Sequence, residues 1–370
     1  MDTNVPVRVL HVFASLDRGG AEGMVMSLYR NIDRSKLQFD FVVNEHPHDY
    51  AHEDEINALG GRVFRMPVFK GINSLQYYHA WRQLFREHPE WKVVHAHHTS
   101  PAFLYLMAAK KLDRITIAHS HIASYEKNLK SLSKIFTRYP LRYISHNLFS
   151  CSDAAAKWMF GKKSNESIIL NNSVDASALR FSCINRIKKR DELKLNSKFV
   201  VGHVGRFETQ KNHDFLLDIF YYIKEKKPDA VLLLVGDGVQ RSKIEEKVCK
   251  LKLEENVEFL GVRSDVVELL SAMDVFVFPS IYEGLPVTLI EAQANGLPCV
   301  VSDSITQESA VSNCVHFLSL DKSAKNWADL IIGFSGNKQR VDTYNDLVIS
   351  GYDIKSNVSW LEEFYLKVFN

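Results

Sequence analysis

Short apolar runs rich in Val, Ile, Leu and Phe alternate with amphipathic stretches along the whole chain. The first half holds six runs that we interpret as buried strands: Val7 to Phe13, Phe39 to Val43, Val93 to His95, Ile115 to Ala118, Leu148 to Ser150 and Ile168 to Leu170. The second half holds five more: Phe199 to Val204, Val231 to Val235, Val257 to Leu260, Val275 to Phe278 and Cys299 to Val301. Buried strands that alternate with helices form parallel sheets with helices on both faces. We therefore predict an α/β fold of two doubly wound, Rossmann-like domains.

A polar, basic segment from Ile187 to Lys194 separates the two series of strands. We predict an N-terminal domain over residues 1–180 and a C-terminal domain over residues 181–350. Residues 351–370 contain an amphipathic helical pattern from Ser359 to Phe369, which we expect to pack back on the N-terminal domain. Ligands of such sheets bind beyond the carboxyl ends of the strands, so we expect the two domains to face a central cleft lined by strand-to-helix loops.

The composition is that of an ordinary globular protein, with 46% apolar and 24% charged residues in 370. The net charge of +2 argues against a protein that coats nucleic acid. This total hides a net of +6 in residues 1–180 and of −4 in the remaining 190. Five widely spaced cysteines without a C-x-x-C pair favour a reducing, cytoplasmic compartment. We find no signal-peptide pattern and no apolar run long enough to span a bilayer.

The loop after the strand Phe199 to Val204 combines a glycine with two cations. Gly205 lets the backbone approach a ligand closely. Arg206 and Lys211 bring positive charge to a helix N-terminus, where the helix dipole also favours an anion. These features suit a diphosphate. The same two charges also fit solvated side chains at the start of a helix, and the loop alone leaves both interpretations open.

Two glutamates flank the start of a later predicted helix. Pro286 fits the first helical position, so we expect the helix from Val287 to Asn295, with Glu291 inside it and Glu283 in the preceding loop. A carboxylate accepts two hydroxyl hydrogen bonds at once, which suits a ribose or hexose diol. The alternative is that Glu283 caps the helix and that Glu291 is exposed.

A third loop, Gly236-Asp237-Gly238, also follows a predicted strand, but position 241 is Arg. The dinucleotide fingerprint G-x-G-x-x-G is therefore incomplete, and the Walker pattern is absent as well. This argues against a nicotinamide-dependent dehydrogenase and against a P-loop kinase.

Together these loops resemble the glycosyltransferase family 4 pattern on the GT-B fold. The E-x7-E element appears as EGLPVTLIEAQANGLPCVVSD from Glu283 to Asp303, the diphosphate element as VGRFETQKN from Val204 to Asn212, and a first glycine loop as DRGGAE from Asp17 to Glu22. The resemblance covers nearly the whole chain and is greatest to the bacterial exopolysaccharide and capsule branch. Two positions depart from the pattern: Ser173 replaces a usual glycine, and Gln293 replaces a commoner methionine, which we expect to be neutral.

The resemblance implies a hexosyltransferase that moves a sugar from a nucleotide sugar, with UDP expected, to an acceptor glycan with retention of configuration. Arg206 and Lys211 would hold the diphosphate, and Glu291 the ribose hydroxyls. His119 matches the acceptor-side histidine of the family. The implied catalytic residues are His119, Glu283, Arg206 and Lys211. The implied donor-binding residues are Gly19, Gly20, Arg206, Lys211, Gly236, Val262, Arg263, Glu283, Gly284, Leu285, Pro286, Val287 and Glu291.

Cations and backbone amides would stabilise the leaving diphosphate without a metal, and the sequence contains no D-x-D triplet. Retention without an obvious nucleophile favours front-face attack. Among the 12 histidines of the first 180 residues are His95, His97, His98, His119 and His121. They lack a thiolate pair or an H-E-x-x-H motif, so we interpret them as packed or cleft-lining side chains. We expect no metal and no cofactor, the nucleotide sugar being a substrate.

A basic helical pattern runs through Lys127, Lys130, Lys134, Arg138 and Arg142, opposite apolar and aromatic positions. This pattern suits docking on an anionic membrane surface, which would bring the enzyme to a lipid-linked acceptor. The alternative is a surface helix with its apolar face on the domain core. We expect a cytoplasmic protein, peripheral to the inner face of the membrane.

Two other functions share this architecture. A nucleotide-sugar 2-epimerase would need acid and base carboxylates around the sugar and no acceptor, and product analysis with and without acceptor would distinguish it. A non-catalytic sugar-nucleotide-binding protein should tolerate the loss of His119 or Lys211, but both residues are present.

Overall fold

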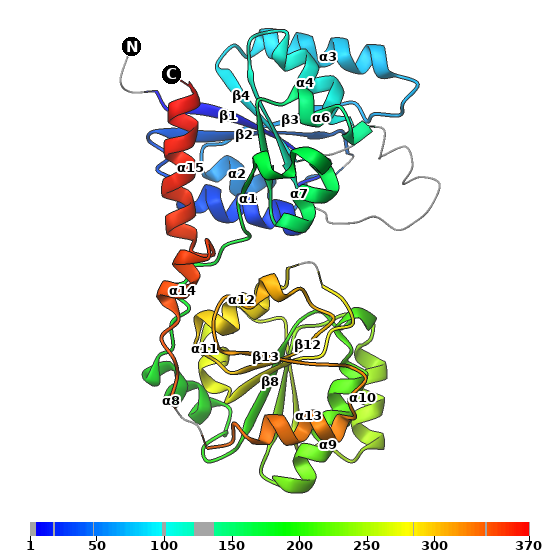
Figure 1. Ribbon diagram of the computed structural model, residues 1–370, viewed down its shortest axis with the longest axis vertical. Helices are drawn as coiled ribbons and strands as arrows, with labels where there is room; N and C mark the ends of the chain where they lie inside the picture. The colour runs from blue at the N-terminus through cyan, green and yellow to red at the C-terminus, as the bar shows by residue number, and fades with distance from the viewer. Residues whose placement is uncertain are drawn as a thin grey trace. The chain divides into compact units, whose positions relative to one another are not determined.

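The computed structural model describes residues 5–17, 19–46, 48–97, 101–121, 137–283, 285–336 and 339–369. It divides into two compact units (Figure 1). The first unit comprises Met1–Ser173 and Ile354–Asn370, and the second comprises Val174–Asp353. The predicted boundaries at 180/181 and 350/351 therefore move to 173/174 and 353/354.

The shift of these boundaries has a packing cause. Val174, Ala176 and Leu179 are buried against Ile290 and Tyr352, all within the second unit. The backbone of this segment is also tied to the second unit, since Val174 N donates to Tyr352 O over 2.9 Å. Residues 174–180 consequently belong to the second unit.

The first unit is built on a parallel sheet with the strand order β3-β2-β1-β4-β5-β6-β7. Its strands within the described residues are β1 (Val7–Val12), β2 (Leu37–Asn44), β3 (Val63–Met66), β4 (Trp91–Ala96), β5 (Ile115–Ser120), β6 (Asn147–Ser150) and β7 (Ser167–Ile169). The helices described in this unit are α1 (Gly20–Asn31), α2 (Glu53–Ala58), α3 (Ser74–Glu87), α4 (Ala102–Lys110), α6 (Leu141–Ile144), α7 (Asp153–Phe160), the 3₁₀ turn η1 (Gly161–Glu166) and α15 (Ile354–Phe369).

The second unit repeats this plan with a parallel sheet in the order β10-β9-β8-β11-β12-β13. Its described strands are β8 (Val200–Val204), β9 (Val231–Val235), β10 (Val257–Gly261), β11 (Val275–Phe278), β12 (Cys299–Ser302) and β13 (Val315–Leu318). Its described helices are α8 (Cys183–Glu192), η2 (Thr209–Lys211), α9 (His213–Lys226), α10 (Arg241–Lys250), α11 (Val266–Ala272), α12 (Val287–Ala294), η3 (Gln307–Ser309), α13 (Ala324–Ile332) and α14 (Tyr344–Ile349). The predicted pair of doubly wound parallel-sheet domains is confirmed.

Each sheet is covered on both faces, as the uninterrupted apolar runs of its strands require. In the first unit the strand side chains alternate between two separate hydrophobic clusters, with Val9 in one and Leu10 in the other. The second unit has the same arrangement, with Val201 and Val200 on opposite faces. The strand ends that carry the predicted loops are thereby held on rigid scaffolds.

Most of the polar, basic segment from Ile187 to Lys194, which separates the two series of strands in the sequence, belongs to helix α8 of the second unit. In α8, the Oγ of Ser182 accepts a hydrogen bond from Asn185 N and caps the helix. Arg186 and Arg190 of α8 pair with Asp274 at 2.5 and 3.2 Å. These ion pairs help to explain why a basic segment packs within the second unit, where α8 contacts α11.

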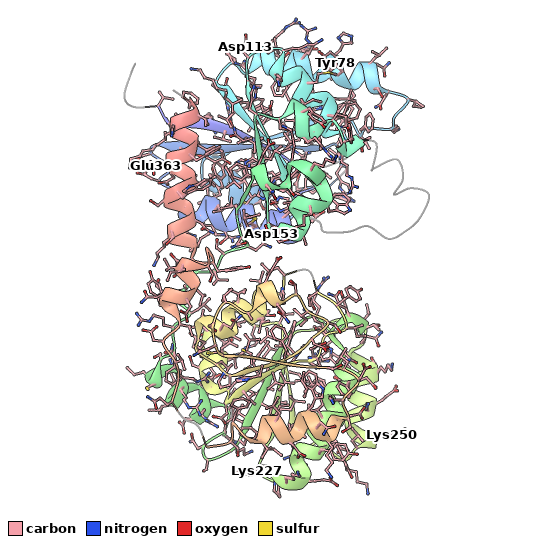
Figure 2. The ribbon with its side chains drawn as sticks, viewed as in Figure 1. Tyr78, Asp113, Asp153, Lys227, Lys250 and Glu363 are labelled. Atoms are coloured by element: carbon pink, nitrogen blue, oxygen red, sulfur yellow. The ribbon has the colours of Figure 1, made fainter. Side chains whose placement is uncertain are left out.

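The C-terminal helix α15 lies on the first unit, beside α1 and the ends of β1 and β4 (Figure 1). Ile354, Val358, Leu361 and Tyr365 recur at helical spacing and are buried in the cluster that contains Val9. Figure 2 shows the side chain of Glu363 on the outer face of the same helix. Of the helices in the described ranges, none is long and apolar enough to cross a membrane.

Candidate functional site

The loops at the carboxyl ends of β8 and β9 pack backbone against backbone. Gly205 N donates to Val235 O, and Phe207 N donates to Asp237 O, each over 2.9 Å. Gly236 has a φ of +132°, and a Cβ at this position would lie 2.1 Å from the carbonyl oxygen of Gly205. Only glycine fits there, so this residue shapes the backbone that the predicted phosphate loop rests on.

Lys211 and Glu283 come from distant parts of the sequence and form an ion pair. Nζ of Lys211 lies 2.8 Å from Oε1 of Glu283, and the two side chains are only 15% and 9% exposed. The ammonium group also lies 4.5 Å from the ring centroid of Phe278, the last residue of β11. Because Glu283 is paired in this way and α12 has no side-chain cap, the alternative of a capping glutamate is not observed.

Side-chain amides hold the two loops together around this pair. Nδ2 of Asn212 donates to Pro279 O over 3.1 Å, and Nε2 of Gln210 donates to Tyr282 O over 2.9 Å. Asn212 adopts a left-handed conformation with a φ of +57° between η2 and α9, which asparagine tolerates better than most residues. The turn directs Lys211 toward Glu283.

Arg206 differs from Lys211 in being exposed. Its side chain is 78% accessible, and its Nη1 lies 3.0 Å from Oε1 of Glu208. An exposed pair of this kind contributes little to stability. The guanidinium therefore remains available to an anion at this edge of the sheet.

Glu291 lies half-buried on the second turn of α12. Burial raises the pKa of its carboxyl from 4.5 to about 7. In the described part of the chain no side chain bonds to this carboxylate. The predicted alternative of an exposed Glu291 is wrong, and the site offers an acceptor whose ionisation a ligand with hydroxyl donors would favour.

The other predicted donor-binding residues of the second unit lie in the loops around β10 and α12. Val262 is 82% exposed, whereas the Arg263 guanidinium is bound to Asp265 at 2.6 Å. Leu285, Pro286 and Val287 lead into α12, which begins at Val287, and Pro286 is its cap residue rather than its first helical residue. Gly284 lies outside the described residues.

The first unit carries the other predicted ligand contacts. Gly19 precedes α1, and Gly20 is its first residue. A Cβ on Gly19 would lie 2.2 Å from Oε2 of Glu22, so the carboxylate of Glu22 folds over the start of its own helix. Around Gly20 a Cβ would meet nothing within 4 Å, which leaves room for a ligand close to its amide.

A cluster of histidines occupies the carboxyl ends of β1, β4 and β5. Side chains two apart on a strand share a face, and the rings of His119 and His121 stack with their centroids 4.0 Å apart. His95 and His97 stack in the same way at 4.4 Å. His11 of β1 completes the cluster, with its Nδ1 2.9 Å from Nε2 of His97.

Burial keeps these imidazoles neutral. It lowers the pKa of His11 and His121 to about 3, and it lowers the pKa of His95, His97 and His119 well below 6.5. The ring nitrogens of His97, His119 and His121 lie within 4.8 Å of one another, as do those of His11, His95 and His97, so either trio is close enough to share a metal ion. Nδ1 of His97 and Nε2 of His121, at 2.8 Å, are already joined by a hydrogen bond.

A separate cavity of about 140 Å³ lies between α9 and α10. Glu208, Thr209, Gln240 and Lys243 are among the residues that line it. None of the predicted donor-binding residues of the described chain does so. The predicted donor-binding residues of the described chain lie in the loops at the strand ends and not in this cavity.

The basic pattern is described only in part. Lys127, Lys130 and Lys134 lie outside the described residues. Arg138 stacks 4.2 Å from the ring of Trp158, and Nη2 of Arg142 donates to Met159 O over 3.2 Å.

Sequence reasoning missed three residues that shape these sites. His11 could have been noticed as a polar residue inside the first apolar run. Asn212 stands at the end of the quoted phosphate motif, and its residue type, which tolerates a left-handed conformation, was a weak signal of the turn. In the sequence, Tyr365 is only one more apolar position of an amphipathic helix. In the structure, its hydroxyl lies 2.6 Å from Nδ1 of His95.

Two family models match the chain, one in each unit. The model described as Glycosyltransferase Family 4 matches residues 18–177, and the model described as Glycosyl transferases group 1 matches residues 185–352. Both matched ranges contain the loops described above.

Two curated relatives match over nearly their whole length. The putative glycosyltransferase EpsF of Bacillus subtilis is 36% identical over 372 residues, covering 97% of this chain and 96% of that protein. The capsular polysaccharide biosynthesis glycosyltransferase CapH of Staphylococcus aureus is 25% identical, covering 97% and 99%. Among solved structures, HepE of Anabaena in complex with UDP has a TM-score of 0.80 at 19% identity, covering 97% of this chain and 100% of that one.

Proposed function

The chain belongs to the family 4, group 1 glycosyltransferases of the GT-B fold, and from this premise we propose that it moves a hexose from a UDP-sugar to a growing exopolysaccharide or capsule glycan. The name of the relative CapH supports the pathway. HepE complexes with UDP and with UDP-glucose support the donor. We further propose that the acceptor is lipid-linked and that the enzyme works on the cytoplasmic side.

The observation that carries this proposal is the buried ion pair between Lys211 and Glu283. It joins the loop after β8 to the loop before α12 at the carboxyl edge of the sheet, where such folds bind ligands. Lys211 and the exposed Arg206 would neutralise the donor diphosphate. Glu283 would then accept hydrogen bonds from hydroxyls of the donor sugar, and Glu291 would accept those of the ribose.

The first unit would supply the remaining contacts. The amide of Gly20, at the first position of α1, is suited to a phosphate oxygen. His119 would lie on the acceptor side, and its buried Nε2 has no hydrogen-bond partner within the described chain. Gly19, Gly236, Val262, Arg263 and the backbone of residues 284–287 would complete the donor contacts.

We propose a retaining, metal-independent transfer by front-face attack. The bond between the anomeric carbon and the β-phosphate oxygen breaks, the acceptor oxygen bonds to that carbon on the same face, and the departing phosphate oxygen takes the acceptor's proton. Lys211 and Arg206 stabilise the charge that builds on the diphosphate. Retained activity after dialysis against a chelator and an unchanged anomer in the product are expected. Trapping a covalent glycosyl-enzyme during turnover would refute the front-face step.

Calorimetric titration with UDP-, GDP- and ADP-sugars tests the donor class. We expect UDP-glucose or another UDP-sugar to bind. Arg206→Ala should weaken this binding about tenfold or more, the typical value of a charge-assisted hydrogen bond to phosphate. Lys250→Ala, on the exposed end of α10, is the matched control and should bind as the unchanged protein does. If no nucleotide sugar binds the unchanged protein, the proposed function fails.

Membrane attachment is a separate part of the proposal. Lys127, Lys130, Lys134, Arg138 and Arg142 would face an anionic leaflet. The protein should sediment with vesicles of mixed anionic and zwitterionic lipid at low salt and be released at high salt. Failure to sediment at low salt counts against attachment and leaves the transferase proposal intact.

A further inference from the structure

A line of hydrogen bonds connects the C-terminal helix to His119. The hydroxyl of Tyr365 lies 2.6 Å from Nδ1 of His95, and Nε2 of His95 lies 3.1 Å from Nδ1 of His119. All three side chains are 1% exposed or less. Nε2 of His119 is buried and has no hydrogen-bond partner among the residues that the structure describes. This series of hydrogen bonds thus begins at the hydroxyl of Tyr365 and ends at Nε2 of His119, which has no partner in the described chain.

The Tyr365 hydroxyl sets the direction of these bonds. Within the described chain its only partner is His95, and a buried O–H that fails to donate loses the hydrogen bond it made to water. With the hydroxyl donating to Nδ1 of His95, that nitrogen carries no hydrogen. A neutral imidazole carries one N–H, so Nε2 of His95 holds the hydrogen and donates to Nδ1 of His119. His119 is then left with its own hydrogen on Nε2.

The surroundings keep His119 in its neutral form. The titratable groups that face it are His95 and His97 from β4, His121 beyond the end of β5, and His11 from β1. β6 places only an apolar aromatic ring against it. Burial lowers the pKa of His119 well below 6.5, and the neighbouring imidazoles lower it further. No carboxylate of the described residues contributes to this pKa.

We propose that Tyr365 and His95 are positioning residues that hold His119 as the Nε2–H tautomer, so that it donates a hydrogen bond to an oxygen of the bound substrate. This inference rests on the proposed transferase function and makes His119 a donor rather than a base. A sugar hydroxyl or a phosphate oxygen is the chemical class that accepts from a neutral imidazole N–H.

The tautomer can be measured without any substrate. Long-range proton–nitrogen correlation spectra of protein labelled in its histidine rings report which nitrogen carries the hydrogen, and His119→Gln identifies the signals of His119. We expect hydrogen on Nε2 in both His95 and His119 at pH 7. Hydrogen on Nδ1 of His119, or on both of its nitrogens, overturns the proposal.

Tyr365→Phe tests the catalytic consequence and keeps the buried ring. Without the hydroxyl, His95 can take the other tautomer, and its Nε2 can then accept from Nδ1–H of His119, which removes the hydrogen from Nε2 of His119. With UDP-glucose as the probe, kcat should fall about tenfold across the profile from pH 6 to pH 8. The matched control is Tyr29→Phe, which removes a 2.6 Å hydrogen bond to Gln38 in the same hydrophobic cluster. A Tyr365→Phe profile that coincides with that of Tyr29→Phe overturns the proposal.

Variants of His95 separate positioning from packing. The amide of His95→Gln can still donate to Nδ1 of His119 and should keep kcat within about threefold, whereas His95→Leu cannot donate and should lose about tenfold or more. Equal activity in the two variants contradicts the relay. If the unchanged protein turns over no UDP-sugar, the proposed function loses its support while the spectra still decide the tautomer.

Discussion

The ionisation of Glu291 links the stability of the second unit to its proposed ligand. Burial raises the pKa of this carboxyl from 4.5 to about 7, and each pKa unit corresponds to about 1.4 kcal/mol. Ionising Glu291 therefore costs the folded protein roughly 3 kcal/mol more than the unfolded chain. Because the folded pKa is raised, this contribution to stability is complete below pH 4.5 and is lost as the pH rises through about 7.

Glu291→Gln keeps the shape of the side chain and removes its ionisation. Relative to the unchanged protein, the variant should gain stability between pH 5 and pH 8.5, by up to roughly 3 kcal/mol. Urea unfolding at pH 5, 7 and 8.5 measures this difference. A constant difference across these three pH values would refute the buried, titrating carboxylate.

The same ionisation should appear in donor binding. At pH 6 only about one Glu291 carboxyl in ten is ionised if its pKa is about 7. In the proposed function the ionised form would accept both ribose hydroxyls, so the affinity for UDP-glucose should fall about tenfold from pH 8 to pH 6. UDP-glucose suits this titration because its diphosphate diester does not titrate in that range. Calorimetry on the unchanged protein and on Glu291→Gln should give a pH-dependent and a pH-independent affinity, and equal slopes would remove Glu291 from the ribose site.

Three further predictions concern stability. Gly236→Ala places a Cβ against the carbonyl oxygen of Gly205 at a φ that disfavours alanine. It should lower the free energy of unfolding in urea by about 3 kcal/mol or more. The control is Gly23→Ala on α1, where a Cβ meets nothing, and it should be neutral or stabilising. Lys211→Ala leaves the carboxylate of Glu283 without its partner and should cost about 3 kcal/mol; the double variant with Glu283→Ala should recover part of this loss in a double-mutant cycle. Burial raises the pKa of Asp40, but hydrogen bonds from Arg8, Arg62 and Trp91 outweigh it and lower that pKa. Asp40→Asn should therefore cost about 3 kcal/mol at pH 7, with the gap closing as the pH falls below 3.8, and thermal melts at pH 7 and pH 3 would check it.

The predicted strands and the phosphate loop followed from local patterns. Continuous apolar runs such as Val231–Val235 form parallel strands because both faces of each strand are covered. Gly205, Arg206 and Lys211 could be placed at a strand end because they follow such a run directly. Two strands were missed: β3 and β13 lie at the edges of their sheets and carry the half-buried, mixed composition that edge strands allow.

Contacts between distant segments left no local pattern to read. Gln293, expected to be a neutral replacement, is fully buried; its Oε1 accepts from Val311 N over 2.9 Å, and its Nε2 donates to Ser309 O over 2.8 Å. The amide therefore holds the loop before β13 against α12, a contact that depends on where residues 309–312 fold. The hydrogen bond from Tyr365 to His95 likewise joins segments that only tertiary packing brings together.

The return of α15 to the first unit fixes an order of assembly during translation. The hydrophobic cluster that contains Val9 needs Leu361 and Tyr365, which the ribosome adds only after it has made the whole of Val174–Asp353. The second unit can thus fold on the ribosome while the first, although begun earlier, still exposes apolar surface where α15 will lie. Domains made earlier usually finish folding first, but here we expect the later one to do so. Until α15 is made, we expect the nascent first unit to expose that apolar surface.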